Sequence, residues 1–340
     1  MFHHKVERFG ILDDGRQVES IVLQGGGLTA RFLTYGAILQ DLRFANHNPS
    51  LVLGLKSMDD YLAHSRYFGA TAGRYANRIR DGQATIDGTT HQLDRNFLGK
   101  HHLHGGRGGM GKQLWHIESV SDNSLCLAIV IPDGDMGFPG TLKVTANFTL
   151  LEGGVLDIVY RATTSAPTLC NLAHHSYFNL GNTSNVLDHQ LQIDANSYLP
   201  VDDELIPTGE IKPVDGTDFD YRVPRIMRST TISSPHDHNF CLASDRLPLR
   251  EVAHLKDFDS GMSMHIHTTE AGLQVFDGGV LDVPVLGVDD RQIGAYAGIA
   301  IEPQVWPDSP NNSHFPQALL MPSQRYEQHT QFIFNKEITQ

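Results

Sequence analysis

Histidine is the residue type whose placement in this sequence most suggests chemistry. There are 19 histidines in 340 residues, and several lie beside glycine, asparagine or aromatic residues in stretches without a helix or strand period. These stretches cover residues 101–106, 171–179 and 236–240, and a fourth aperiodic stretch, 302–308, adds Glu302. Imidazole changes its charge near neutral pH, so histidines grouped with acids and aromatics indicate proton transfer.

Four titratable side chains in these stretches are the candidates for such chemistry: His104, His175, Asp237 and Glu302. Each has glycine, proline or aromatic neighbours that fit no packing period. Taken singly, each would more often be a structural hydrogen-bonding group than a catalyst. The aromatic residues of the same stretches are expected to pack in the core: Tyr177, Phe178 and Trp306.

The glycine-rich stretch after His104 matches a nucleotide-binding pattern only weakly. Gly106, Gly111 and Lys112 have the spacing of a phosphate-binding loop. Gln113, however, replaces the serine or threonine that would hold magnesium, and residues 114–117 are predicted to form a strand where such a loop needs a helix. We therefore expect a flexible turn that lets the backbone approach a ligand beside His104.

Paired histidines raise the question of a metal site. His236 and His238, like His265 and His267, are spaced so that both rings of a pair lie on one face of a strand. The second pair alternates with apolar residues, as on the solvated side of an ordinary strand, and no cysteine or third histidine is expected beside it. We therefore predict that the protein holds no metal.

The composition predicts a soluble globular protein in a reducing compartment. The formal net charge of −13 disfavours nucleic acids and anionic membranes and favours a neutral small molecule as partner. Residues 1–10 lack the apolar stretch of a secretory signal, and the most apolar uncharged run, 293–301, is too short to span a bilayer, so we expect a cytoplasmic protein. The three cysteines are predicted to be reduced, buried thiols: Cys126, Cys170 and Cys241.

The elements that must position the candidate side chains are predicted to be almost all strands. Apolar and polar residues alternate from 142 to 150 and again from 156 to 162, which predicts an antiparallel hairpin. One short helix is expected after Ser57, a candidate cap. Further strands are predicted at residues 28–33, 38–44, 125–131, 262–268 and 331–335.

These elements predict an all-β fold, a large antiparallel β-sandwich with few short helices. Strands without helices to cover them must bury one face against another sheet. No linker, repeat or change in composition divides the chain, so we expect a single domain over residues 1–340.

Several segments, taken in order along the chain, resemble motifs of the aldose 1-epimerase (galactose mutarotase) family. They are residues 73–79 (GRYANRI), 103–106 (LHGG), 133–140 (DGDMGFPG), 175–180 (HSYFNL), 213–220 (PVDGTDFD), 237–240 (DHNF) and 302–304 (EPQ). The resemblance runs from about the first predicted strand to the C-terminus. It implies the galactose mutarotase-like supersandwich, with a sugar bound in an open cleft.

The resemblance also implies a reaction, the interconversion of the α and β anomers of a free aldose by opening and closing the hemiacetal ring. No cofactor is needed, because a base that removes the C1 hydroxyl proton and an acid that protonates the ring oxygen suffice. Glu302 matches the family's base and His175 its acid, and His104 is expected to assist at the ring oxygen. Positions that bind sugar hydroxyls are matched by Asn77, Arg78 and Asp237.

Two segments depart from the family's usual pattern. Ala173 and His174 stand where the family commonly has Thr-Asn, which changes a hydrogen-bonding partner near the acid. Residues 273–279 (LQVFDGG) lack the usual Tyr-Thr-Gly-Asn-like run and so alter one wall of the pocket. Galactose and glucose are the default substrates, while arabinose, xylose and fucose stay open, as does the oligomeric state.

Other functions are compatible with the same architecture. They are a hexose-6-phosphate 1-epimerase, a glycoside hydrolase that pairs Glu302 with Asp237, and a non-catalytic carbohydrate-binding protein. The presence of both Glu302 and His175 speaks against the last, and a hydrolase needs a defined distance between its carboxylates. A phosphosugar would favour more cationic side chains near the cleft than the few that the motifs offer: Arg74, Arg78 and Arg107.

Overall fold

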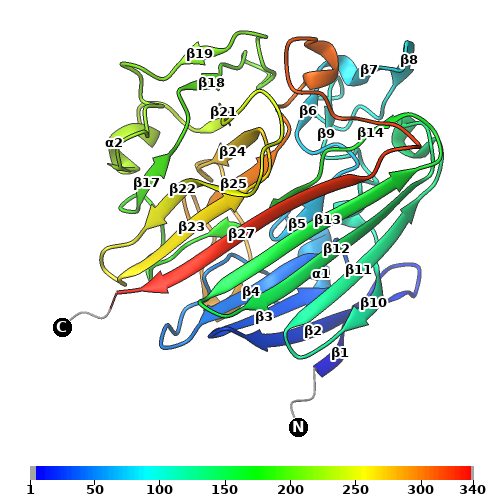
Figure 1. Cartoon of the computed structure of the whole chain (residues 1–340). Coiled ribbons are helices and arrows are strands. Elements are labelled where there is room, and N and C mark those ends of the chain that lie inside the picture. Colours follow the sequence, from blue (N-terminus) through cyan, green and yellow to red (C-terminus); the bar gives the residue numbers. More distant parts are fainter. Residues whose placement is uncertain (1–4, 338–340) are drawn as a thin grey trace.

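A nine-stranded antiparallel sheet forms one layer of the protein in the computed structural model, which describes residues 5–337 (Figure 1). The late strand β27 lies in the middle of this sheet, between β13 and β23. In spatial order the strands are β10 (His116–Val120), β11 (Ser124–Ile131), β12 (Leu142–Leu151), β13 (Val155–Thr164), β27 (Tyr326–Lys336), β23 (Met262–Thr268), β22 (Arg250–Lys256), β17 (Gln190–Ile193) and β20 (Arg225–Ile226).

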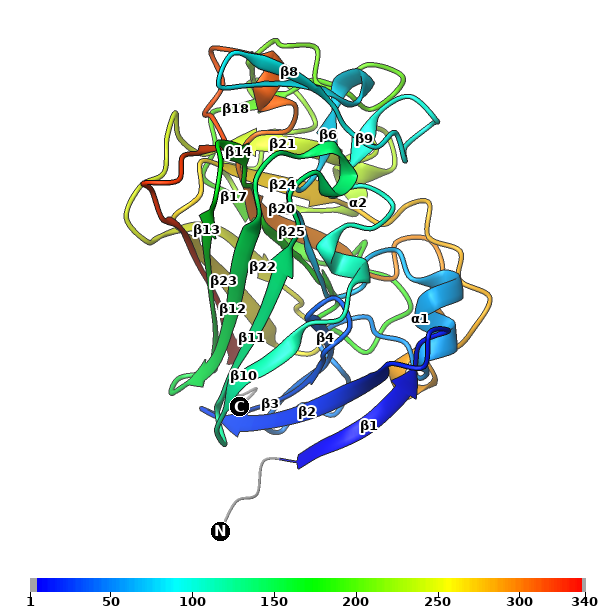
Figure 2. The ribbon, with the colours of Figure 1, turned by 90° about the vertical axis from the view of Figure 1, so that its right-hand side faces the viewer.

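Two further sheets pack against this layer. The six-stranded sheet has the order β16 (Tyr177–Phe178), β25 (Ile299–Gln304), β24 (Gly272–Phe276), β21 (Asp237–Cys241), β18 (Ser197–Leu199) and β19 (Lys212–Pro213). The four-stranded sheet is a meander of β1 (Lys5–Ile11), β2 (Gln17–Gly25), β3 (Leu28–Leu33) and β4 (Ile38–Phe44). Figure 2 shows the nine-stranded layer nearly edge-on, with the other sheets beside it.

Short strand pairs carry the connections near the candidate site. They are β5 (Ala70–Ala72) with β15 (Ala173–His175), β6 (Arg78–Ile79) with β9 (His102–Leu103), β7 (Gln83–Ile86) with β8 (Thr89–Gln92), and β14 (Thr168–Leu169) with β26 (Leu319–Leu320).

Helices are short throughout residues 5–337. The α-helices are α1 (Met58–His64) and α2 (Arg228–Thr231), and the 3₁₀ turns are η1 (Arg80–Gly82), η2 (Met110–Lys112), η3 (Asp135–Gly137), η4 (Val288–Asp290) and η5 (Ser309–Asn311). None of them has the length and apolarity that a membrane crossing requires. As expected, the side chain of Ser57 caps α1 by accepting a hydrogen bond from the Asp60 N–H.

The core lies between the layers and is closed by aromatic contacts between sheets. Phe178 of β16 and Phe332 of β27 have ring centroids 4.9 Å apart. Phe32 of β3 and Phe148 of β12 lie 4.5 Å apart and join the four-stranded sheet to the same core. These side chains belong to one buried cluster whose members extend from Ile21 to Phe334.

The predicted antiparallel sandwich is confirmed, and its hairpin forms where the alternation of residues placed it. β12 and β13 pair from Leu142 opposite Thr164 to Leu151 opposite Val155. From Leu142 to Leu150 and from Leu156 to Ala162 the alternate positions are buried and the intervening ones are not. The strands expected at 28–33, 38–44 and 262–268 have those bounds, and those expected at 125–131 and 331–335 lie inside β11 and β27.

Two smaller expectations need correction. The strand expected at 114–117 begins only at His116, because Leu114 makes an isolated bridge to Tyr35 instead. All three cysteines are free, as predicted. Cys126 is only partly buried, however, because it lies on the face of β11 opposite to the buried Leu125 and Leu127.

Replacing Phe332 by alanine should destabilise the protein strongly, because it opens a cavity where the two layers meet. We expect the free energy of unfolding to fall by about 3–5 kcal/mol. Val130→Ala on β11, where the side chain is 52 % exposed, should change it by less than about 0.5 kcal/mol. Urea unfolding of both variants measures the difference, and similar losses would contradict this placement of the core.

Candidate active site

The candidate residues meet beside the six-stranded sheet, although they come from five separate segments. Glu302 lies on β25 and Asp237 begins β21, two strands separated by β24. His175 ends β15, which pairs with β5. Arg78 begins β6, and His104 follows β9, its pairing partner. Strand pairing therefore brings these side chains together.

Glu302 and His175 form a buried pair. Oε1 of Glu302 lies 3.6 Å from Nε2 of His175, and the two residues are 2 % and 5 % exposed. Burial raises the pKa of Glu302 well above its usual value, and the nearby carboxylate of Asp237 acts in the same direction. Burial lowers the pKa of His175 to about 4. Each group is therefore driven toward its uncharged form when the site is empty.

Together these shifts leave one proton on the pair between the lowered pKa of His175 and the raised pKa of Glu302. Above about pH 4 His175 is neutral, and below its raised pKa Glu302 stays protonated. A single proton on such a coupled pair belongs to both groups, whichever atom carries it at a given moment. The pair can therefore give a proton at one atom and take one at another without changing its total charge.

The tautomer of His104 is fixed by the backbone. Nδ1 of His104 accepts a hydrogen bond from the Asn77 N–H at 3.1 Å, so this nitrogen carries no proton. Burial lowers the pKa of His104 well below its usual value, and the ring of His175 and the guanidinium of Arg78 act in the same direction. A neutral His104 must then carry its proton on Nε2, where it can donate to a ligand.

Arg78, Asp237 and Gln274 form the polar wall of the site. Arg78 donates to Asp237 at 2.9 Å, and the side-chain amide of Gln274 donates to the other carboxylate oxygen at 2.7 Å. Burial alone would raise the pKa of Asp237, but these two donors hold it below its usual value. Asp237 is therefore an anionic acceptor that Arg78 and Gln274 hold in place.

The importance of Gln274 could not be foreseen from the sequence. It lies on β24 directly opposite Glu302 on β25 and within bonding distance of Asp237. A glutamine in an apolar strand gives no signal of its own, and only the register of β24 brings it to the site. The segment 273–279, which departs from the family's usual run, supplies this strand.

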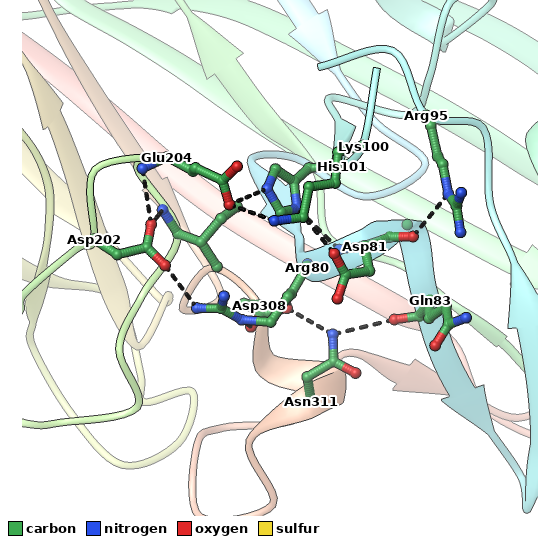
Figure 3. A network of polar contacts seen from close by, with 12 residues as sticks. Arg80, Asp81, Gln83, Arg95, Lys100, His101, Asp202, Glu204, Asp308 and Asn311 are labelled. Atoms are coloured by element: carbon green, nitrogen blue, oxygen red, sulfur yellow. Dashed lines mark hydrogen bonds and ion pairs between the residues drawn. The ribbon is translucent and has the colours of Figure 1, made fainter. Parts of the chain in front are cut away.

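Figure 3 shows the polar network that fastens the chain beyond β6 to the loop between β18 and β19. Arg80 pairs with Asp202 at 3.0 Å. His101 is fully buried, and its Nε2 lies 3.1 Å from the carboxylate of Glu204. The same loop lines a narrow crevice next to Arg78. The network thus fixes the loop between β18 and β19 as one wall of the crevice beside Arg78.

The glycine-rich turn after His104 packs closely on the protein's own backbone. A Cβ on Gly105, whose φ is +86°, would lie 1.8 Å from the carbonyl oxygen of Gly73. A Cβ on Gly109 would lie 2.4 Å from the carbonyl oxygen of His104 itself. The glycines therefore let the turn pack on the protein's own backbone, and the expected role in approaching a ligand is not needed to explain them.

His174 points away from the site. It is 2 % exposed, its Nε2 lies 2.7 Å from the Ser176 hydroxyl, and its ring packs near Phe148 and Phe332. Burial lowers the pKa of His174 to about 3. Successive residues of β15 face opposite sides, so His174 enters the core while His175 faces Glu302.

The aromatic residues near the site are buried, as predicted. Phe178 and Trp306 are 0 % and 4 % exposed. Tyr177, at 2 %, also stacks on His175, with ring centroids 5.1 Å apart and planes 30° apart. Tyr177 therefore combines core packing with a contact to the candidate acid.

The paired histidines form no metal site in residues 5–337, where no group of three or more His, Cys, Asp or Glu could hold an ion. The expectation that no third histidine lies beside His265 and His267 is wrong, however. His254, opposite His265 in the pairing of β22 and β23, stacks on its ring at 4.2 Å. Glu251 binds Nδ1 of His265 at 2.6 Å, so these rings are engaged with one another and with a carboxylate.

Residues 19–332 match the sequence model of the aldose 1-epimerase family. The chain belongs to this family. A galactose mutarotase from Mus musculus is 39% identical over 337 residues, which cover 96% of this chain and 97% of that protein. An aldose 1-epimerase from Escherichia coli strain K12 is 34% identical over 341 residues, which cover 95% and 97%.

Solved structures of aldose 1-epimerases have the same fold. An aldose epimerase homologue from C. elegans superposes with a TM-score of 0.88 at 29% identity, covering 94% of this chain and 99% of that one. A galactose 1-epimerase from Lactobacillus acidophilus gives 0.85 at 26% identity, covering 99% and 100%. The match therefore extends over nearly the whole family fold.

Removing the carboxyl of Glu302 should change how stability depends on pH. Between about pH 4.5 and 6.5 the wild-type pair holds one proton in both states, because the unfolded chain has an ionised Glu302 and a charged His175. In Glu302→Gln the folded protein keeps His175 neutral while the unfolded chain protonates it, so the free energy of unfolding rises with pH. We expect a rise of about 2 kcal/mol relative to wild type across this window.

Urea unfolding of both proteins at several pH values measures this slope. His175→Asn is the matched control, since it leaves Glu302 alone and should give the opposite slope. Equal slopes in the wild type and in Glu302→Gln would show that the two groups do not share a proton.

Proposed function

We propose that this protein is a mutarotase in which Glu302 is the base and His175 the acid. The 3.6 Å contact between these two buried groups carries the proposal. Family membership supports the reaction class, and the names of the relatives, galactose mutarotase and aldose 1-epimerase, support galactose or another free aldose as the substrate. The relatives with those activities match over nearly their whole length.

Ring opening needs two proton transfers, and the pair supplies both. When the single proton of the pair lies on His175, carboxylate Glu302 takes the proton of the C1 hydroxyl while imidazolium His175 gives its proton to the ring oxygen, and the bond between C1 and that oxygen breaks. The C1 aldehyde then rotates, Glu302 returns a proton to the carbonyl oxygen, and His175 recovers one from the chain hydroxyl as the ring closes. The pair holds one proton before and after each transfer.

The surrounding polar groups suit the hydroxyls of a sugar. Asp237 is an acceptor, Arg78 a donor, and the Nε2–H of His104 is a further donor available to the ring oxygen. Asn77 fixes His104 through its backbone, and its own side chain accepts from the Arg78 N–H at 2.8 Å. Mixed donors and acceptors of this kind bind hydroxyls, which both donate and accept.

A phosphosugar is less well served by these surroundings. Arg74 is buried, and its guanidinium donates to the carbonyl oxygens of Pro139 and Gly140 at 2.9 and 2.7 Å. Arg107 is exposed and paired with Asp94 at 2.6 Å. Of the arginines named from the sequence, only Arg78 reaches the site, and it is bound to Asp237, so a free aldose is favoured.

Polarimetry on freshly dissolved α-galactose, α-glucose and L-arabinose, in the presence of a chelator, tests the proposal. The wild type should accelerate the approach to anomeric equilibrium. Glu302→Gln and His175→Asn should each lower kcat by at least about 100-fold, since each removes one of the two proton-transfer groups. Circular dichroism of both variants checks that they are folded.

Normal activity of either variant would remove that residue from the mechanism. No acceleration of any sugar by the folded wild type would contradict the mutarotase itself and favour a phosphosugar epimerase or a silent sugar-binding protein.

The rate should depend on pH through the proton count of the pair. Below about pH 4, where His175 gains a second proton, no base is left, so kcat/KM should fall. Above the raised pKa of Glu302 the pair loses its last proton and the acid is missing, so kcat/KM should fall again. A pH profile of kcat/KM measures these limbs, and a rate independent of pH would contradict catalysis by two groups.

A further inference from the structure

Tyr67 packs against both histidines of the site. Its ring centroid lies 4.6 Å from that of His104 and 5.8 Å from that of His175, with the latter ring inclined by only 20°. His104 and His175 are themselves in edge contact at 5.2 Å. Since Tyr177 also stacks on His175, that ring lies roughly parallel to two tyrosines. Neither imidazole can turn freely while Tyr67 stays in place.

The outer side of Tyr67 is contacted by Lys112, the lysine of the glycine-rich stretch. Its ammonium lies 5.3 Å from the ring centroid of Tyr67, within the range of a cation–π contact. Its charge is also among those that hold the pKa of His104 below its usual value. The sequence pattern that resembles a phosphate loop thus ends in a lysine directed at Tyr67.

The backbone of Tyr67 also shows that its position is imposed by its surroundings. Its φ is +64°, in the left-handed region that residues other than glycine seldom occupy. The chain returns at once to ordinary structure, since the Ala70 N–H donates to the Tyr67 carbonyl and β5 follows. A bulky residue kept in this conformation next to reactive groups is a signal of function.

We propose that Tyr67 is a positioning residue for His104 and His175, with Lys112 holding its ring against them. This inference rests on the proposed mutarotase function for its kinetic part only. Tyr67 keeps the Nε2–H of His104 directed at the ligand and keeps His175 opposite Glu302. It also excludes water from both rings, which disfavours their charged forms in the empty site.

Charged groups from several elements face the rings of His104 and His175, and these charges also influence the pH at which the two histidines titrate. His104 faces His102, Lys112, Arg78 and the ring of His175. His175 faces Asp237 and Arg78, in addition to its partner Glu302. Removing the Tyr67 ring changes none of these charges, so a change in titration would come from ring position and hydration.

Nitrogen-15 NMR of the histidine side chains in the ligand-free protein tests the positioning directly. In the wild type we expect His104 to show one tautomer, protonated at Nε2, with no titration near pH 6.5. Tyr67→Leu should let the ring of His104 turn away from the Asn77 N–H, which mixes the tautomers, and should raise the pH at which His104 and His175 titrate. Tyr67→Phe, which keeps the ring, should restore the wild-type spectrum.

Kinetics give the second measurement. Tyr67→Leu should lower kcat at least about tenfold while KM changes less than about threefold, because displaced groups lose proton transfer more than binding. The acid limb of the pH profile should also move upward by about one pH unit, and Tyr67→Phe should recover most of kcat. Thermal melting checks that each variant is folded.

Substitution of Lys112 tests the inference without changing Tyr67, and the same substitution at Lys143 is its matched control. Lys112→Met removes the charge over Tyr67, and should raise the pH at which His104 titrates. Lys143→Met makes the same chemical change on the exposed side of β12, away from the site, and should leave the histidine spectra and kcat unchanged.

Three results would overturn the inference, two of them for Tyr67 and one for Lys112. Wild-type spectra in Tyr67→Leu would show that the ring does not position the histidines, and a loss confined to KM would make Tyr67 a sugar-binding platform instead. Altered spectra in Lys143→Met as large as those in Lys112→Met would remove Lys112 from the role. If the wild type moves no anomer but Tyr67→Leu still changes the spectra, the proposed function fails and the positioning stands.

Discussion

Burial of one carboxyl group beside one imidazole is the constraint on which the rest of the site depends. Charged groups are costly in a dry environment, and Glu302 and His175 are both nearly inaccessible. Sharing one proton lets the pair be neutral in the empty site and still separate charge when hydroxyls arrive to stabilise it. The surrounding structure must therefore keep water out. It must also hold two side chains, from strands that are far apart in the sequence, with Oε1 of Glu302 and Nε2 of His175 only 3.6 Å apart.

The scaffold meets this demand by placing each group on paired backbone. β25 is flanked by β24 and β16, and β15 is paired to β5, so neither Glu302 nor His175 lies on a free loop. The residues that complete the site are held less regularly. Asn77 and His104 have φ of +66° and +50°, in a region that costs most residues about 1–2 kcal/mol. Regular strands thus hold Glu302 and His175, whereas residues with positive φ in the neighbouring turns, Asn77 and His104, complete the site.

The alternation of apolar and polar residues predicted the sandwich and most strand bounds, because every second side chain of a half-buried strand faces the core. The residue types of the proton pair could also be named from the sequence, through the motifs around His175 and Glu302. Gln274 and Tyr67 could not, because an amide in an apolar strand and a tyrosine before a short strand become significant only when the register places them. His174 shows the same limit, since one step along β15 decides whether a histidine faces the core or the site. The single-domain organisation and the roles of the individual site residues stay predictions.

The position of β27 in the middle of the nine-stranded sheet has a consequence for how the chain folds. Its neighbours β13 and β23 are synthesised long before it, and β13 pairs with residues more than 150 positions later in the sequence. Until residues 326–336 emerge, both neighbours carry open hydrogen-bonding edges next to an incomplete apolar core, which are the features that promote association between nascent chains. Assembly of the nine-stranded sheet should therefore be slow and completed late. A cell that makes this protein quickly would depend on chaperones to shield the open edges of β13 and β23.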